Sequence, residues 1–151
     1  MSLHILCYVA RFDASAMASI DQDIERTLAR SRRLNRMNGV TGAMILTDTA
    51  VVQWLEGDEA SVVDTFACAS ADPRLAQLRQ VLRGPAAERL FAPSWMYFVD
   101  ARSDSRAGLA PEIAALAADA EGATPAMVRA AMQAAAKRLH ACAATRAAML
   151  V

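Results

Sequence analysis

The sequence predicts an α+β protein with a ferredoxin-like β-α-β-β-α-β-β sheet, two helices on one face and C-terminal helices capping the other. Five short β-rich runs bounded by turn residues predict the strands, and two longer segments with apolar residues at helical spacing predict the helices between them. The second face of such a sheet needs a cover. The alanine-rich segment that follows the last strand can supply it.

The first two elements are a strand over residues 4–10 and a helix over residues 18–34. The buried stripe of this helix recurs every four residues and consists of Ile20, Ile24 and Leu28. Ser15 or Ser19 is available as its N-cap. Asn38-Gly39 is expected to end it, because glycine tolerates the left-handed conformation that closes a helix.

The middle of the chain predicts a β-hairpin, a second helix and two further strands. These elements cover residues 40–46 and 50–55 (the hairpin), 60–71 (the helix), and 78–82 and 95–99 (the strands). Thr47-Asp48-Thr49 is the hairpin turn, and Pro73 lies just beyond the end of the helix.

The C-terminal part of the sequence predicts two helices. A short one covers residues 111–120, and Thr124-Pro125 supplies an N-cap and a first-turn proline for a helix that runs nearly to Val151. The apolar positions Val128, Met132 and Leu139 form a stripe that either caps the sheet or meets a partner protein. We therefore expect residues 1–100 to form the sheet domain and residues 101–151 to be a helical cap of the same domain.

Composition favours one soluble globular domain. The 151 residues are 55% hydrophobic and 21% charged, and 16 basic residues balance 16 acidic ones. This balance argues against a nucleic-acid partner, since phosphate binding needs a clustered basic excess. A local basic run at Arg30, Arg32, Arg33 and Arg36 is interpreted as the solvated face of a helix.

Three scattered cysteines, Cys7, Cys68 and Cys142, predict neither a disulfide framework nor a zinc site. Cys7 and Cys68 fall in apolar patterns and are expected to be small buried hydrophobic residues. The N-terminal residues lack the features of a signal peptide, and no apolar run reaches the length of a membrane span. We therefore expect a cytoplasmic protein without a membrane partner.

Some polar residues lie where the pattern is apolar. Ser31 and Asn35 continue the buried stripe of the first helix. A core-facing Asn must form hydrogen bonds, or it costs about 1–3 kcal/mol. Its partner is either backbone at the helix end or a bound ligand, and the pattern leaves both open.

Two further polar residues lie on strands. Gln53 shares a face with Val51 and Leu55, so its amide is either buried beside a heterocyclic ligand or at a sheet edge in solvent. If the first strand is its neighbour, Tyr8 and Gln53 meet on one face, and a buried Tyr hydroxyl usually has a partner.

On the last strand, Met96 shares one face with Ser94 and Phe98, while Trp95 and Tyr97 take the other. Met96 on its own is ordinary core. Arg74, just after Asp72-Pro73, suits a carbonyl or phosphate group or is a surface charge at the helix end.

Enzyme motifs are missing: the sequence has no glycine-rich phosphate loop, no GxSxG and no HExxH. His4 and His140 are far apart in sequence, and Glu56, next to Gly57, is expected to be a turn residue and not an acid catalyst. From the residues alone, the chain is an α+β domain with a polar cluster around an apolar slot.

Five segments in order carry a resemblance: Tyr8 in the first strand, SRRLNRMNGVTG (31–42), QWLEG (53–57), Asp72-Pro73-Arg74, and Arg89-Leu90-Phe91 leading to Met96. They resemble the signature of BLUF domains, which sense blue light with a flavin. The resemblance covers about the first two-thirds of the chain, and the spacing between the segments also matches.

The resemblance implies FMN or FAD held between the two helices. Tyr8 would donate an electron and a proton to the light-excited flavin, and Gln53, bridging the two, would be left rotated or tautomerised. The absorbance then shifts slightly to the red until the state decays in the dark. The further cofactor contacts that it implies are Asn35 at the pyrimidine end of the ring, Asp72 and Arg74 near the ring edge or ribityl chain, Met96 beside Gln53, and Ser31 close to the same network.

Three positions depart from the family pattern. Leu34 stands where Asn or His is frequent, and Leu75 where His is frequent. The family commonly places Trp two residues before Met96, whereas here Ser94 holds that place and the Trp follows it. We therefore expect Ser94 to lie nearer the flavin than Trp95.

The resemblance favours a photosensory protein without catalytic turnover, in bacteria. After Met96 about 55 residues remain, too few for an attached enzyme domain. The output would pass through the last strand and the C-terminal helices to a partner protein, and a homodimer or higher homo-oligomer is expected. The alternatives are a small flavin-dependent reductase, which needs substrate access at the ring, and a ferredoxin-like interaction module without flavin.

Overall fold

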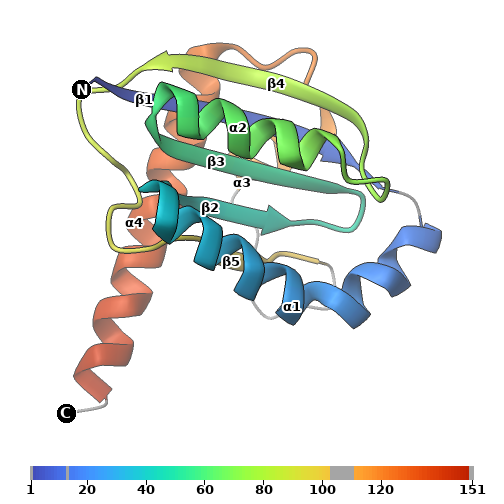
Figure 1. The fold of residues 1–151 in the computed structure, drawn as a ribbon, viewed down its shortest axis with the longest axis horizontal. Coiled ribbons are helices and arrows are strands. Elements are labelled where there is room, and N and C mark those ends of the chain that lie inside the picture. Colours follow the sequence, from blue (N-terminus) through green and yellow to red (C-terminus); the bar gives the residue numbers. More distant parts are fainter. Residues whose placement is uncertain (1, 13, 103–110, 150–151) are drawn as a thin grey trace.

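The computed structural model describes residues 2–12, 14–102 and 111–149. In chain order the elements are β1 (Leu3–Arg11), α1 (Ala14–Asn38), β2 (Thr41–Leu46), β3 (Ala50–Asp58), α2 (Glu59–Ser70), β4 (Ala76–Pro85), β5 (Tyr97–Asp100), α3 (Pro111–Ala118) and α4 (Pro125–Met149). Each predicted strand and helix is present (Figure 1).

The five strands form one sheet in the order β4-β1-β3-β2-β5. The β2–β5 pair is parallel and the other pairs are antiparallel. β1 and β3 therefore lie inside the sheet, and the register places Tyr8 directly opposite Gln53. This confirms the predicted ferredoxin-like α+β class.

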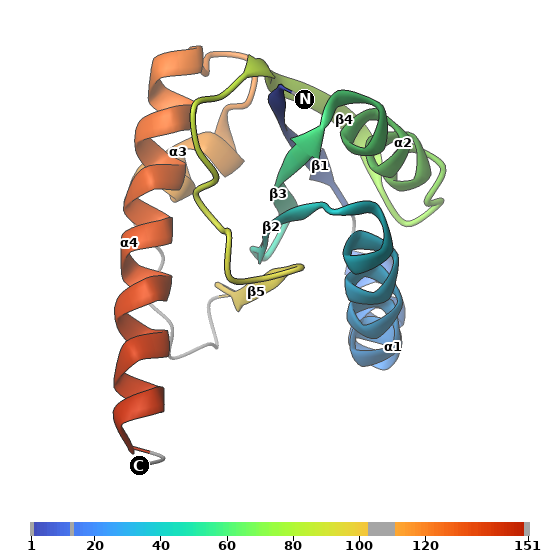
Figure 2. The same ribbon diagram turned by 60° about the vertical axis from the view of Figure 1, so that its left-hand side comes forward.

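The helices lie in two layers (Figure 2). α1 and α2 cover one face of the sheet, where Leu6, Tyr8 and Ala10 pack with Leu28 and Val62. α3 and α4 cover the other face, which carries every second side chain of each strand. There the alternate residues of β1 pack in one core with residues of α3 and α4, which include Ile5, Cys7, Val9, Ile113, Val128 and Met132.

Several boundaries differ from those expected. α1 begins at Ala14, so Ser15 and Ser19 lie inside the helix and neither is its N-cap. The helix does end at Asn38, and Gly39 takes the left-handed conformation with a φ of 69°. β5 begins two residues later than expected, at Tyr97, which leaves Trp95 in the preceding loop.

The two later helices begin with side-chain caps. Asp58 is the N-cap of α2, and its Oδ2 accepts from the Ser61 amide at 3.0 Å. The pKa of Asp58 is lowered, chiefly by the hydrogen bond from Ser61. Thr124 caps α4 as predicted, since its Oγ1 accepts from the Met127 amide at 3.3 Å. The side chains of Leu139, His140 and Cys142 lie outside the described part.

The two described cysteines differ. Cys7 is fully buried as predicted, and desolvation raises the pKa of its thiol. Cys68 is exposed, so the prediction of a buried residue was wrong. α2 buries the face that carries Val62 and Phe66, and a residue two positions beyond Phe66 points away from that face. Within the described ranges, no helix is long and apolar enough to cross a membrane.

Candidate functional site

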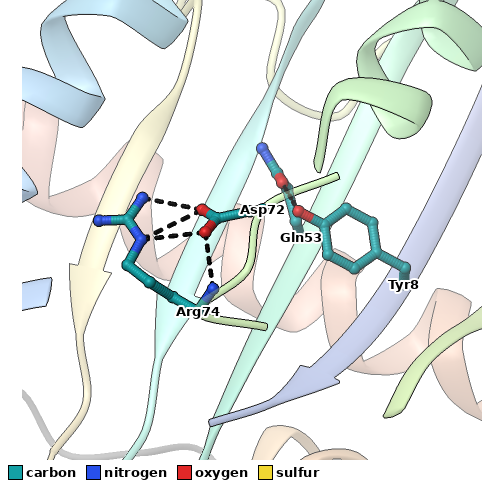
Figure 3. Close-up of polar contacts among 4 residues, drawn as sticks. All are labelled: Tyr8, Gln53, Asp72 and Arg74. Atoms are coloured by element: carbon teal, nitrogen blue, oxygen red, sulfur yellow. Dashed lines mark hydrogen bonds and ion pairs between the residues drawn. The ribbon is translucent and has the colours of Figure 1, made fainter. Parts of the chain in front are cut away.

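Tyr8 and Gln53 form the centre of the site. Their side chains face each other across β1 and β3, and the Tyr8 hydroxyl donates to Gln53 Oε1 (Figure 3). Tyr8 is 1% exposed and Gln53 is 5% exposed. A Gln at a solvated sheet edge is thereby excluded. Burial, followed by the nearby Cys7 and Asp72, raises the pKa of the Tyr8 phenol, so this side chain stays neutral.

Met96 lies beside this pair. Its Sδ accepts from Gln53 Nε2 at 3.6 Å, and its side chain is buried in the core between the sheet and the first two helices. The ring of Phe66, from α2, lies 5.5 Å from the Tyr8 ring with a 59° angle between their planes. Gln53 is therefore held at both ends of its amide, by Tyr8 at the oxygen and by Met96 at the nitrogen.

Asn35 is buried, as its place on the stripe predicted, at 2% exposure. Its Nδ2 donates to the backbone oxygen of Trp95 at 2.7 Å. The partner is thus backbone, but in the loop before β5 and not at the helix end. One turn earlier, Arg32 Nε donates to the Met96 carbonyl at 3.0 Å. These two bonds fasten α1 to the segment that positions Met96.

Asp72 and Arg74 form an ion pair after α2 (Figure 3). Arg74 Nε lies 3.0 Å from Asp72 Oδ1, Arg74 NH2 lies 2.8 Å from Oδ2, and the Arg74 amide also donates to Oδ1 at 2.9 Å. The side-chain bond from Arg74 is the main cause that lowers the pKa of Asp72. The pair is half-buried, and because each charge is bonded to the other, neither side chain is a free ion.

A cavity of about 670 Å³ opens between α1, α2 and the sheet. Six of the predicted site residues line it: Tyr8, Ser31, Asn35, Gln53, Asp72 and Arg74. Met96 does not, and lies next to Gln53 within the core. The apolar part of the wall includes Ile20, Ile24, Leu34, Met44 and Phe98. The lining also includes Arg30, Asp64 and Cys68, which no sequence pattern assigned to a site, because exposed positions at the edge of a helix give no periodic signal.

Glu56 is not a turn residue, and that prediction was wrong. It is fully buried in β3, on the face that α3 and α4 cover. Its carboxylate accepts from four donors, namely Thr41 Oγ1 (2.9 Å), Trp54 Nε1 (3.0 Å), and the amides of Leu90 (2.9 Å) and Phe91 (2.7 Å). β3 continues past Gly57, so the glycine that suggested a turn lies inside the strand. The Glu56 side chain fixes the loop that leads to Met96.

Comparison with known proteins decides the family. A model of the family described as "Sensors of blue-light using FAD" matches residues 3–97. This chain belongs to the BLUF family. The match spans β1 to the start of β5 and so contains the Tyr8–Gln53 pair and every residue given above for the cavity lining except Phe98.

Solved BLUF structures share the fold. The dark-state structure of BlrB, a BLUF protein, is 30% identical and aligns over 91% of this chain and 97% of its own, with a TM-score of 0.69. The ground state of BlsA is 26% identical over 65% of this chain and 64% of its own, at 0.61. Klebsiella pneumoniae BlrP1 with FMN and cyclic diGMP is 25% identical, at 0.57, over 65% of this chain and 26% of its own. A search of the curated proteins found no match.

The residues present fit the flavin that the family uses. Apolar side chains on α1, β2 and β5 suit the faces of a planar ring. The amides of Asn35 and Gln53 at the buried end supply donors and acceptors for the polar edge of such a ring. Exposed residues of α1 and α2, among them Arg30 and Cys68, also line the cavity, and on that solvent side a polar chain attached to the ring can leave the protein.

Proposed function

We propose that this BLUF protein senses blue light through Tyr8 and Gln53, with Tyr8 as the photochemical donor and Gln53 as the group that stores the signal. The observation that carries the proposal is the hydrogen bond between these two side chains at the buried end of the cavity. A flavin excited by blue light is a strong oxidant. A neutral phenol in hydrogen-bond contact is the group that can supply an electron and a proton together.

Gln53 suits the role of switch because its amide offers a donor at one end and an acceptor at the other. Its oxygen accepts from Tyr8 and its nitrogen donates to the Met96 sulfur, which is a weak acceptor. Loss of the Tyr8 proton removes the donor to Gln53 Oε1, and return of the proton restores it. Rotation or tautomerisation of the amide between these events exchanges donor for acceptor at the cavity wall without a lasting change in covalent structure.

The remaining lining residues would hold the cofactor. Asn35 is placed at the buried end, and Ser31 lies one turn earlier on the same helix. Asp72 and Arg74 line the cavity from the segment after α2. Their mutual ion pair leaves Arg74 with one unoccupied guanidinium nitrogen, NH1, as a donor toward the ring edge or the ribityl chain.

The signal has a short route to the other face of the sheet. Met96 contacts Gln53 in the core beneath α1 and α2. The next residue, Tyr97, packs against the core beneath α3 and α4, with its ring 5.9 Å from that of Phe91. A change at Gln53 that moves Met96 therefore bears on the α3–α4 layer. We infer that a partner protein, or a second copy of this chain, reads that layer.

The testing experiment is an absorption spectrum of the purified protein before blue illumination, immediately after it, and after a period in the dark. A flavin spectrum with a small red shift that reverses in the dark supports the proposal. The Gln53→Leu variant should keep the flavin and lose the shift. A flavin that bleaches and stays reduced would favour a reductase instead, and a protein that binds no added flavin would contradict the proposal.

A further inference from the structure

We propose that Arg30 binds the phosphate group of the flavin nucleotide at the mouth of the cavity and so makes the protein prefer FMN and FAD to riboflavin. The inference rests on the proposed flavin site and adds a residue that determines which flavin the site retains. Arg30 is exposed and lines the cavity.

The position of Arg30 on α1 places it at the rim. Successive helical residues are rotated by about 100°, so Arg30 lies roughly a quarter-turn from Ser31, which continues the buried stripe. The buried end of the cavity holds Tyr8, Gln53 and Asn35, whereas the exposed lining residues at α2 are Asp64 and Cys68. A flavin ring against the buried amides therefore directs its phosphate-bearing chain toward the solvent side, where Arg30 lies.

Among the described residues that line the cavity, two are cations, Arg30 and Arg74, and they differ in availability. Arg74 is paired with Asp72 through Nε and NH2. In the part of the chain that the structure describes, Arg30 has no ion pair or hydrogen bond, so all five of its N–H donors remain for a ligand. A guanidinium binds a phosphate with two parallel hydrogen bonds, which a ribityl hydroxyl cannot match in strength.

The charge pattern of α1 points the same way. Residues 26–38 contain five arginines and no acidic residue. Arg26 and Arg33 are exposed on the outer side of the same helix and raise the positive potential around Arg30. Across the mouth, Asp64 repels an anion from α2 and so favours a phosphate position nearer α1.

The test compares flavins that share the ring but differ in phosphate. Protein prepared without flavin is titrated with riboflavin, FMN and FAD, and binding is followed by quenching of flavin fluorescence. We expect Arg30→Ala to weaken FMN and FAD about tenfold while riboflavin affinity stays within about twofold. Arg30→Lys should recover part of the loss. Arg33→Ala is the matched control: it removes the same charge from an exposed position that does not line the cavity, so it should weaken FMN binding much less than Arg30→Ala does.

The outcomes distinguish a failure of the Arg30 role from a failure of the flavin site itself. Equal loss for riboflavin and FMN in Arg30→Ala, an unchanged FMN affinity, or an equal loss in Arg33→Ala would each overturn the role of Arg30 while leaving the flavin site intact. If the unmodified protein binds none of the three flavins, the proposed function and this inference both fail. Added inorganic phosphate should compete with FMN in the unmodified protein and should not affect riboflavin.

Discussion

Gln53 and Glu56 hold the same loop from opposite faces of β3. Gln53 faces the cavity and donates to the Met96 sulfur, and Glu56 faces the α3–α4 layer and accepts from the amides of Leu90 and Phe91. An odd separation along a strand places two side chains on opposite faces, so one strand carries both contacts. The residues 90–96 are thereby fixed at both ends relative to the photochemical pair.

Glu56→Ala should destabilise the protein strongly. It leaves the Trp54 indole and two backbone amides without their acceptor in the core, and we expect the free energy of unfolding to fall by roughly 3–5 kcal/mol. Urea unfolding measures the change. Glu88→Ala, at an exposed position, should stay within about 0.5 kcal/mol. Equal effects of the two variants would show that the buried network contributes little.

Tyr8→Phe should retain flavin and lose the light-induced red shift, because the phenol is the donor in the proposed step. It should also cost about 1–3 kcal/mol of stability, since Gln53 Oε1 loses its donor in the core. Tyr97→Phe is the control, because Tyr97 packs on the opposite sheet face. A normal photocycle in Tyr8→Phe, measured as a light-minus-dark difference spectrum, would exclude Tyr8 as donor.

Met96→Ala should change the rate of dark recovery and lower stability by about 2–5 kcal/mol, because it removes both the sulfur partner of Gln53 and a large buried side chain. Met96→Leu keeps the volume and removes only the sulfur, so its stability cost should stay below about 1.5 kcal/mol. If Met96→Leu recovers in the dark at the unmodified rate while Met96→Ala does not, packing and not the sulfur contact sets that rate.

We expect Ser94, and not Trp95, to affect the photocycle. Trp95 is 41% exposed, and Ser94 Oγ accepts from the Met96 amide at 3.2 Å. Ser94→Ala should therefore alter dark recovery, whereas Trp95→Phe should leave both the red shift and the recovery rate within about twofold. Absorbance after a light pulse measures both. A large change in Trp95→Phe alone would place the indole at the flavin site.

Alkaline pH should destabilise the protein through Cys7 and Tyr8. Burial raises the pKa of both groups above their ordinary values of 9.0 and 10.0. Their contribution to stability is complete below those values and is lost at higher pH, because the unfolded chain then releases protons that the folded chain retains. Urea unfolding between about pH 8 and about pH 11 should show this fall. The fall in the free energy of unfolding with pH should be shallower in Tyr8→Phe. An unchanged slope in that variant would show that Tyr8 does not contribute to the fall.

Local patterns in the sequence determined the fold. The five strands, the two helices between them and the capped α4 all follow from alternation, helical periodicity and turn residues, which act between residues close in the chain. The same periodicity placed Asn35 on the buried stripe of its helix, and alternation gave Gln53 the face of Val51 and Leu55 but left open whether its amide was buried; both side chains are buried in the structure. Their polarity on apolar faces indicated a site before any pairing of strands was known.

Only the tertiary structure decided which side chains from distant segments contact one another. The strand order brings Tyr8 opposite Gln53, and it gives Asn35 the carbonyl of Trp95 as its partner. It also buries Glu56 and leaves Cys68 in solvent, which the sequence patterns had reversed. Periodicity states which face of its own element a residue takes, but burial depends on what packs against that face. That packing comes from contacts between segments far apart in the chain, and local pattern does not encode them.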